Sequence, residues 1–245
     1  MTDPVKRIAM WSGPRNISTA MMRSWENRDD TAVVDEPFYA CYLTASGVEH
    51  PMQKEILADQ SSLWTDVISN ELQKSLENGQ QIQYQKHMTH HMIGELDQKW
   101  FASLAHIFLI RHPAEVLMSY SQKRESVNAL DLGFARQYEL YQTAVKLGAN
   151  PPILDTSDIL QNPAKLLRKL CTKIGVSFDQ NMLNWPAGKR DSDGVWAPHW
   201  YANVEKSTCF APYEKKIISL TTDAQLVVDQ CMPYYQTMFD KRIIA

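Results

Sequence analysis

Short apolar runs alternate with longer segments of helical spacing along most of the chain, and this alternation constrains the fold more than any other feature. Strands are expected at residues 7–11, 32–35, 82–85, 105–110 and 152–155. Helices are expected at residues 16–28, 62–77, 113–124, 132–147, 163–174 and 222–239. Repeated strand–helix–strand units with mostly apolar strands predict an α/β fold, in which helices cover both faces of a central parallel sheet.

The composition predicts one globular domain over residues 1–245, because no linker-like stretch, repeat or composition shift divides the chain. With 25 basic and 28 acidic residues, the net charge is −3. This balance argues against a nucleic-acid partner, since coating phosphates requires a basic surface. No run of about 18 uncharged apolar residues occurs. We therefore expect no membrane partner and a cytoplasmic location.

The loop between the first expected strand and the first expected helix has the composition of a phosphate cradle. Its sequence is Trp-Ser-Gly-Pro-Arg-Asn-Ile-Ser-Thr over residues 11–19. Free N–H groups at a helix start and the positive end of the helix dipole attract an anion, to which Arg15, Ser18 and Thr19 could donate. The Walker A pattern GxxxxGK[ST] is absent. The alternative interpretation is a tight strand–helix connection in which Ser18 and Thr19 only start the helix.

A second motif follows the fourth expected strand, where Arg111, His112 and Pro113 are followed by Ser119 eight residues after Arg111. Together with the first loop, this motif resembles the two nucleotide signatures of the PAPS-dependent sulfotransferases. One signature is a P-[KR]-x-x-[ST]-T loop for the 5′-phosphosulfate, and the other is R-x-P with a later serine for the 3′-phosphate. The resemblance implies that Arg111 and Ser119 bind the 3′-phosphate of PAPS.

By the same resemblance, the first loop binds the 5′-phosphosulfate through Arg15, Asn16, Ser18 and Thr19. Ile17 stands where the family usually has glycine, and Asn16 stands where it has serine or another small residue. These departures leave two alternatives open. The loop belongs either to a PAPS-dependent enzyme or to a catalytically silent P-loop protein that binds a nucleotide or phosphate.

Two further stretches agree with the family pattern. An acidic-aliphatic turn and Asn162-Pro163 precede a helix that ends at Ile174-Gly175, an order common in sulfotransferases. The motifs WSGPRN-x-ST and VVDEPFYA also resemble a sulfotransferase-like group whose members are sometimes labelled branched-chain aminotransferase-like. Pyridoxal phosphate chemistry needs a Schiff-base lysine and a different phosphate cup, and the sequence arranges neither. The resemblance therefore implies a P-loop-type fold of three layers.

A late basic loop contains Lys189 and Arg190, followed by Gly194 and Trp196. It weakly resembles the loop that closes on the 3′-phosphate in cytosolic sulfotransferases, although the spacing and order differ. Lys189 and Arg190 are therefore candidate donor-binding residues, and a solvated basic turn is the alternative.

The resemblance implies that a sulfuryl group moves from PAPS to a hydroxyl or amine of a small acceptor. Negative charge grows on the oxygen that leaves with the adenosine bisphosphate, and Arg15 is the candidate for stabilising it. The acceptor needs a general base. Glu36 is favoured because it directly follows an expected strand and precedes Pro37, which fixes the local backbone. His87, expected with Lys86 in the loop after the third strand, is the alternative base.

The remaining expectations concern metals, the acceptor pocket and the competing enzyme class. His87, His90 and His91 do not form a ligand set like HExxH with a further ligand, so no metal is expected. A P-loop kinase or NTPase is the competing class, but it needs the Walker lysine and a carboxylate for Mg²⁺. Six aromatic residues could line the acceptor pocket or equally belong to the core. They are Phe38, Tyr39, Tyr42, Trp196, Trp200 and Tyr201.

Overall fold

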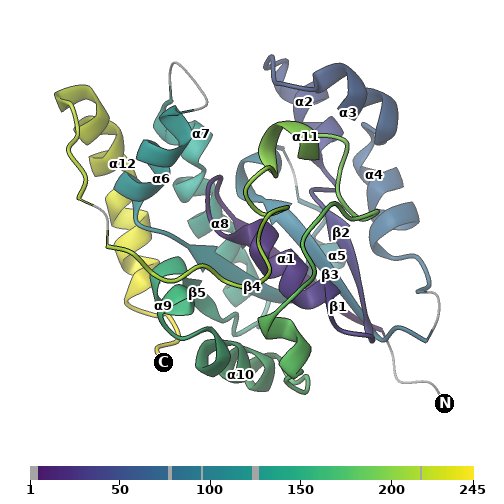
Figure 1. Cartoon of the computed structure of the whole chain (residues 1–245). Helices are drawn as coiled ribbons and strands as arrows, with labels where there is room; N and C mark the ends of the chain where they lie inside the picture. Colours follow the sequence, from purple (N-terminus) through teal and green to yellow (C-terminus); the bar gives the residue numbers. More distant parts are fainter. Residues whose placement is uncertain (1–4, 77–78, 95, 123–126, 216) are drawn as a thin grey trace.

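Five parallel strands form one sheet in the order β2-β3-β1-β4-β5 (Figure 1). The structure, a computed structural model, describes residues 5–76, 79–94, 96–122, 127–215 and 217–245. The strands are β1 (Lys6–Ser12), β2 (Thr31–Asp35), β3 (Ile82–Met88), β4 (Ala105–Ile110) and β5 (Ile153–Asp155). Ser12 lies opposite both Met88 and Leu109, so the carboxyl ends of β1, β3 and β4 lie at nearly the same level.

Helices occupy the connections between the strands. The longer helices are α1 (Ser18–Glu26), α2 (Tyr39–Ser46), α6 (Pro113–Ser121), α8 (Phe134–Lys146), α10 (Pro163–Ile174) and α12 (Thr222–Phe239). The shorter ones are α3 (Gln53–Asp59), α4 (Trp64–Asp66), α5 (Gln98–Ala102), α7 (Ala129–Leu132), α9 (Thr156–Gln161) and α11 (Ala197–Trp200). A π-helix η1 (Val67–Leu72) and two 3₁₀ turns, η2 (Thr89–His91) and η3 (Gln180–Leu183), complete the set. Proline at the first turn and a side-chain cap start both α6 and α10.

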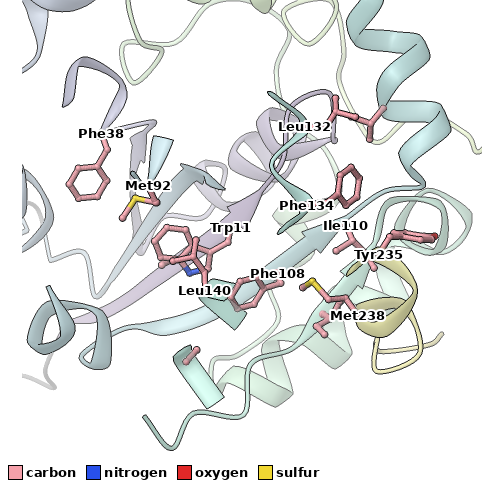
Figure 2. Packing of buried hydrophobic residues seen from close by; sticks show 14 of the residues in the cluster. Trp11, Phe38, Met92, Phe108, Ile110, Leu132, Phe134, Leu140, Tyr235 and Met238 are labelled. Carbon is pink, nitrogen blue, oxygen red and sulfur yellow. The ribbon is translucent and has the colours of Figure 1, made fainter. Parts of the chain in front are cut away.

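Side chains of β1 alternate between two hydrophobic layers, as expected for a strand covered on both faces. Ile8 and Met10 pack with α1, α9 and α10, whereas Ala9 and Trp11 pack with α5, α8 and α12. Figure 2 shows the second layer, in which Trp11 and residues of β4 and α8 are covered by α12 residues such as Met238. Each large side chain buried in this way contributes about 1.5–3 kcal/mol relative to exposure. The fold is the three-layer α/β arrangement that the sequence predicts.

A third hydrophobic cluster covers the carboxyl ends of β2 and β3. It joins Tyr39 and Leu43 of α2 and Ile56 of α3 to Trp196 and Tyr201 from a late part of the chain. Figure 1 shows this arrangement, with α11 (green) beside α2 and α3 (blue). The cluster encloses one side of the site described below.

All five expected strands are present, but β3 is longer than expected and contains Lys86 and His87. The prediction that these two residues lie in a loop was therefore wrong. Helices α10 and α12 have the expected bounds, whereas the helix expected over 132–147 is α8, which begins at Phe134 after the separate short helix α7 and Gly133. The left-handed backbone of Gly133 (φ 70°) ends α7. The expected helix over 62–77 is shorter, and its residue 77 lies outside the described residues, as do residues 123 and 124 of the helix expected over 113–124.

None of the helices in the described part of the chain combines the length and the apolar character needed to cross a bilayer.

Candidate active site

The loops after β1 and β4 meet at the point where the strand order of the sheet reverses. The chain leaves β1 toward β2 on one side and leaves β4 toward β5 on the other, and ligands of open α/β sheets bind at such a point. Arg111 Nη1 donates to the backbone oxygen of Arg15 at 2.7 Å, and Arg15 Nε donates to Ser119 Oγ at 3.0 Å. The structure thus brings together the two motifs that the sequence assigns to the nucleotide.

The loop after β1 has a tight, fixed backbone. A Cβ added to Gly13 would lie 2.7 Å from the carbonyl oxygen of Leu132, so only glycine allows this approach. Arg15 adopts a left-handed backbone (φ 57°), which is uncommon for a residue other than glycine. Ile17 has an ordinary φ of −77°, so the backbone at this position does not require the family's usual glycine. Asn16 Nδ2 donates to the backbone oxygen of Leu109 at 3.0 Å and ties the loop to β4.

Helix α1 begins in this loop with no side-chain cap, and its first residues are Ser18 and Thr19. Uncapped N–H groups of the first turn and the positive end of the helix dipole attract an anion. Both hydroxyl residues line the adjoining pocket.

The pocket has a volume of about 340 Å³. One wall is formed by residues 14–20, Arg111 and Ser119, and a second wall by the segment 200–211 after α11. Between them lie Glu36, Lys86 and several aromatic or histidine side chains. Those side chains are Tyr39, His50, His90, His91 and Tyr120.

Two guanidinium groups give the first wall a positive charge. Burial and the neighbouring Arg111 lower the pKa of Arg15, because two close cations disfavour each other out of water. Arg111 Nε donates to Glu115 Oε2 at 2.9 Å, which offsets only part of this charge. An anion in the pocket would relieve the repulsion between the two arginines.

Glu36 lines the pocket directly after β2. Its backbone is left-handed (φ 41°), so the chain turns sharply as it leaves the strand. Both Glu36 and Asp35 form ion pairs with Lys86 of β3, and the side chains of Lys86 and Asp35 are each 1% exposed. Tyr201 OH donates to Asp35 Oδ2 at 2.6 Å and accepts from Lys86 Nζ at 2.7 Å. These four residues form a buried polar network.

Burial shifts the pKa values in this network. It raises the pKa of the Glu36 carboxyl, and the opposing effect of the Lys86 ammonium does not cancel the rise. Burial alone would lower the pKa of Lys86, but Asp35 and Glu36 outweigh it and hold that pKa well above its ordinary value. Lys86 is therefore a cation at neutral pH, whereas Glu36 can exchange a proton closer to neutrality than an ordinary glutamate.

The family of the chain follows from a match to the family model described as a sulfotransferase domain, which covers residues 6–242. The chain belongs to this sulfotransferase family. Two Arabidopsis thaliana relatives are named branched-chain-amino-acid aminotransferase-like proteins 1 and 2. Each is 31% identical, over 238 and 235 residues, covering 97% and 94% of the chain. The chain covers 42% and 41% of their own lengths.

Solved structures show the same sulfotransferase fold. The sulfotransferase domain of an olefin synthase from Synechococcus PCC 7002 has a TM-score of 0.56 at 18% identity, with 94% of this chain and 95% of that chain covered. A sulfotransferase from Alicyclobacillus acidocaldarius has a TM-score of 0.57 at 8% identity, with 97% of each chain covered. These likenesses confirm the fold class expected from the sequence.

One of the two candidate bases of this sulfotransferase domain lies outside the pocket. The His87 ring stacks on Trp11, with ring centroids 4.4 Å apart, and faces Phe38 on its other side. Its Nε2 is 3.1 Å from Gln85 Oε1, and the side chain is buried. Burial lowers the pKa of His87 to about 3. The structure therefore places His87 in the hydrophobic layer, where it cannot reach an acceptor in the pocket.

Because two buried histidines are neutral in the folded protein, we expect the fold to lose stability in acid. Burial lowers the pKa of His87 to about 3 and that of His106 to about 4, and Trp11 Nε1 donates to the unprotonated Nδ1 of His106 at 3.0 Å. The unfolded chain takes up these protons near pH 6.5, before the folded chain can. The free energy of unfolding should therefore fall as pH drops below about 6.5, by about 1.4 kcal/mol per pH unit for each histidine.

Urea unfolding at pH 7.5 and 5.5 measures this loss. The variant His87→Phe keeps a stacking ring but cannot be protonated, so its loss between the two pH values should be smaller. Equal stability of the wild type at both pH values would contradict the prediction.

Lys189 and Arg190 also lie away from the pocket lining. Arg190 Nη2 donates to the Pro186 oxygen at 2.7 Å, and its Nε is 3.6 Å from Glu26 Oε2. The following Asp193 pairs with the buried Arg23 at 2.6 Å, which fastens this loop to α1. The loop therefore serves the packing of the sulfotransferase domain, and the structure does not bring its two cations to the donor motifs.

The expected aromatic residues divide into two groups. Tyr39, Trp200 and Tyr201 line the pocket. Phe38, Tyr42 and Trp196 are buried in the hydrophobic clusters and do not line the pocket, whereas Tyr39 and Tyr201 belong both to the third cluster and to the pocket lining.

The sequence did not indicate the roles of Lys86 and Tyr201 in the site. It also did not indicate that His50 and Tyr120 line the pocket. The signal available for Lys86 was its place directly after the expected strand 82–85. Tyr201 and His50 come from irregular segments whose positions no periodicity indicates. Within the described residues, no three His, Cys, Asp or Glu side chains gather in a way that could hold a metal ion.

Proposed function

We propose that the pocket binds PAPS and that the domain transfers its sulfuryl group to a hydroxyl or amine of a small acceptor. The observation that carries this proposal is the contact between the two donor motifs, Arg111 to the Arg15 backbone and Arg15 to Ser119, along one wall of one pocket. The sulfotransferase family match supports the same chemistry.

The residues present fit an anionic donor. Uncapped N–H groups at the start of α1, Ser18, Thr19 and Arg15 would hold the 5′-phosphosulfate. Arg111 and Ser119 would hold the 3′-phosphate, since charge-assisted bonds from a guanidinium to phosphate are strong. The two phosphate groups would then be fixed by loops that contact each other through Arg15, Arg111 and Ser119.

Arg15 and Glu36 line the same pocket, which suggests a role for each in the movement of charge and proton. Glu36 would accept the proton of the acceptor hydroxyl or amine while the new bond to sulfur forms. The bond between sulfur and the bridging oxygen breaks, and Arg15 would stabilise the negative charge that remains on the departing adenosine bisphosphate. The acceptor would approach from the side lined by Tyr39, His91 and Trp200.

Binding of PAP tests the donor site directly. Arg111→Ala should weaken PAP about ten- to a hundredfold and weaken 5′-AMP far less, because only PAP carries the 3′-phosphate. Isothermal titration calorimetry without added metal measures both affinities.

Two variants control for indirect effects. Ser119→Ala removes a 3′-phosphate donor but keeps the Arg111 bond to the Arg15 backbone, so it should weaken PAP selectively and by less. Lys189→Ala removes a cation that does not line the pocket and should leave both affinities unchanged. Equal losses for PAP and 5′-AMP in Arg111→Ala, or no PAP binding by the wild type, would overturn the proposal.

A further inference from the structure

The buried network of Asp35, Glu36, Lys86 and Tyr201 contains charged groups that belong to neither of the two proposed donor motifs. It places two carboxylates and one ammonium together, and the side chains of Lys86 and Glu36 are 1% and 10% exposed. Burying charges is costly unless every one is paired and hydrogen-bonded. Such a cluster next to a pocket calls for a functional explanation.

We infer that Lys86 and Tyr201 are positioning residues, which hold the carboxylate of Glu36 at the pocket wall and set the pH at which it accepts a proton. This inference rests on the proposed function, because it concerns the carboxyl that we propose as the base.

The hydrogen bonds of Lys86 argue that it acts through its neighbours. An ammonium group has three N–H donors. Lys86 Nζ donates to Asp35 Oδ1 at 2.8 Å, to Glu36 Oε1 and to Tyr201 OH at 2.7 Å. All three donors are therefore used within the network, and Lys86 has none left for a ligand. Its positive charge and its fixed position act on Glu36 instead.

Tyr201 holds the far side of the network. Its hydroxyl donates to Asp35 Oδ2 at 2.6 Å and accepts from Lys86 and from Trp196 Nε1, the latter at 3.1 Å. The Gly194 N–H also points to Asp35 Oδ2, at 3.3 Å. Tyr201 and the Gly194 N–H thus hold Asp35 in place, and Asp35 in turn accepts a hydrogen bond from Lys86. Glu36 lines the pocket. The arrangement assigns a structural role to one carboxylate and leaves the other for chemistry.

The groups that face Glu36 come from five segments. They are Asp35 of β2, Lys86 of β3, Tyr39 of α2, His91 of η2 and Tyr201 after α11, and His91 Nδ1 is 4.0 Å from Glu36 Oε2. Burial and the charge of Asp35 raise the pKa of Glu36, whereas Lys86 and Tyr201 lower it. Loss of either lowering group should therefore move the titration of Glu36 to higher pH, and loss of the full charge of Lys86 should move it further.

Carbon-13 NMR of the side-chain carboxyls measures this titration without any donor or acceptor. Disappearance of a resonance in Glu36→Gln assigns the Glu36 signal. We expect the midpoint to shift to higher pH in Lys86→Met and, by a smaller amount, in Tyr201→Phe. Where transfer is measured, the acid limb of the pH–rate profile should move in the same order.

Tyr235→Phe is the matched control, because Tyr235 OH donates to a different buried carboxylate, Asp155 Oδ2, at 3.1 Å. It should leave the Glu36 midpoint unchanged. Tyr201→Phe is conservative in size, so it carries the test if Lys86→Met does not fold.

The outcomes separate this inference from the proposed function. An unchanged Glu36 midpoint in Tyr201→Phe and in folded Lys86→Met overturns the positioning role, whatever the activity. Shifted midpoints in a protein that binds no PAP support the positioning role and overturn the proposed function.

Discussion

Replacing Glu36 by glutamine should lower the rate of sulfuryl transfer about 10²- to 10⁴-fold, the range typical of losing a general base. Glutamine keeps the size of the side chain and an oxygen that can accept from Lys86, but it cannot take a proton. PAP affinity should be unchanged, because Glu36 pairs with Lys86, whereas Arg15 and Arg111 of the loops that would hold the nucleotide bond to Ser119 and Glu115. Steady-state transfer to a screened panel of phenols, alcohols and amines, with PAP calorimetry alongside, measures both quantities.

Two comparisons make this result specific. Glu139→Gln neutralises a carboxylate on the surface of α8, with a side chain 59% exposed, and should have no effect on the rate. His87→Asn should reduce stability and leave the chemistry nearly intact, because the ring packs between Trp11 and Phe38. Full activity of Glu36→Gln would rule out Glu36 as the base. Near-normal rates in both Glu36→Gln and His87→Asn would favour an acceptor that ionises without protein help.

Arg15→Ala should lower the turnover about 10²- to 10³-fold and weaken PAP by much less. The reason is that Arg15 would meet charge that appears only as the sulfur–oxygen bond breaks. Its guanidinium is already fixed by the bond to Ser119 at 3.0 Å, so little reorganisation is needed when that charge develops. Single-turnover rates with saturating PAPS, compared with PAP affinity, measure the two effects separately.

Ser119→Ala is the companion variant, since it removes the partner of Arg15 and keeps the cation. Its turnover should fall by less than that of Arg15→Ala. An unchanged turnover in Arg15→Ala would remove Arg15 from catalysis, and a loss confined to PAP affinity would assign it to ground-state binding alone.

The meeting of the two motifs at one edge of the sheet could be predicted because it depends on local sequence. Arg15, Ser18 and Thr19 follow a strand and start a helix, and Arg111 follows another strand, so the parallel sheet places them at one edge. That the two loops lie next to each other follows from the topology that the strand–helix alternation predicts.

The polar network could not be predicted in the same way. Lys86 was expected in a loop because the third strand was expected to end at Gln85, yet its ion pairs with Asp35 and Glu36 allow β3 to continue through it. Tyr201 joins the network by accepting a hydrogen bond from Lys86, which is 115 residues away in the sequence. Helix α2 was missed because its residues Tyr39 to Leu43 are all buried, which leaves no amphipathic stripe to recognise.

The two walls of the pocket differ in how closely they are connected to the sheet, and therefore in which substitutions they tolerate. The wall of residues 14–20, Arg111 and Ser119 is fastened to the sheet, where Gln137 Nε2 donates at 2.9 Å to the backbone oxygens of both Trp11 and Leu109, so changes there disturb the ends of β1 and β4 together. The facing wall is the single segment 200–211, which lies outside the sheet. Within this segment Phe210 is buried against Trp185 and belongs to the core, whereas Asn203, Cys209 and Ala211 are exposed and line the pocket. For engineering, these three exposed positions are the natural ones to vary when a different acceptor is wanted, because their side chains can change without altering a strand or the core.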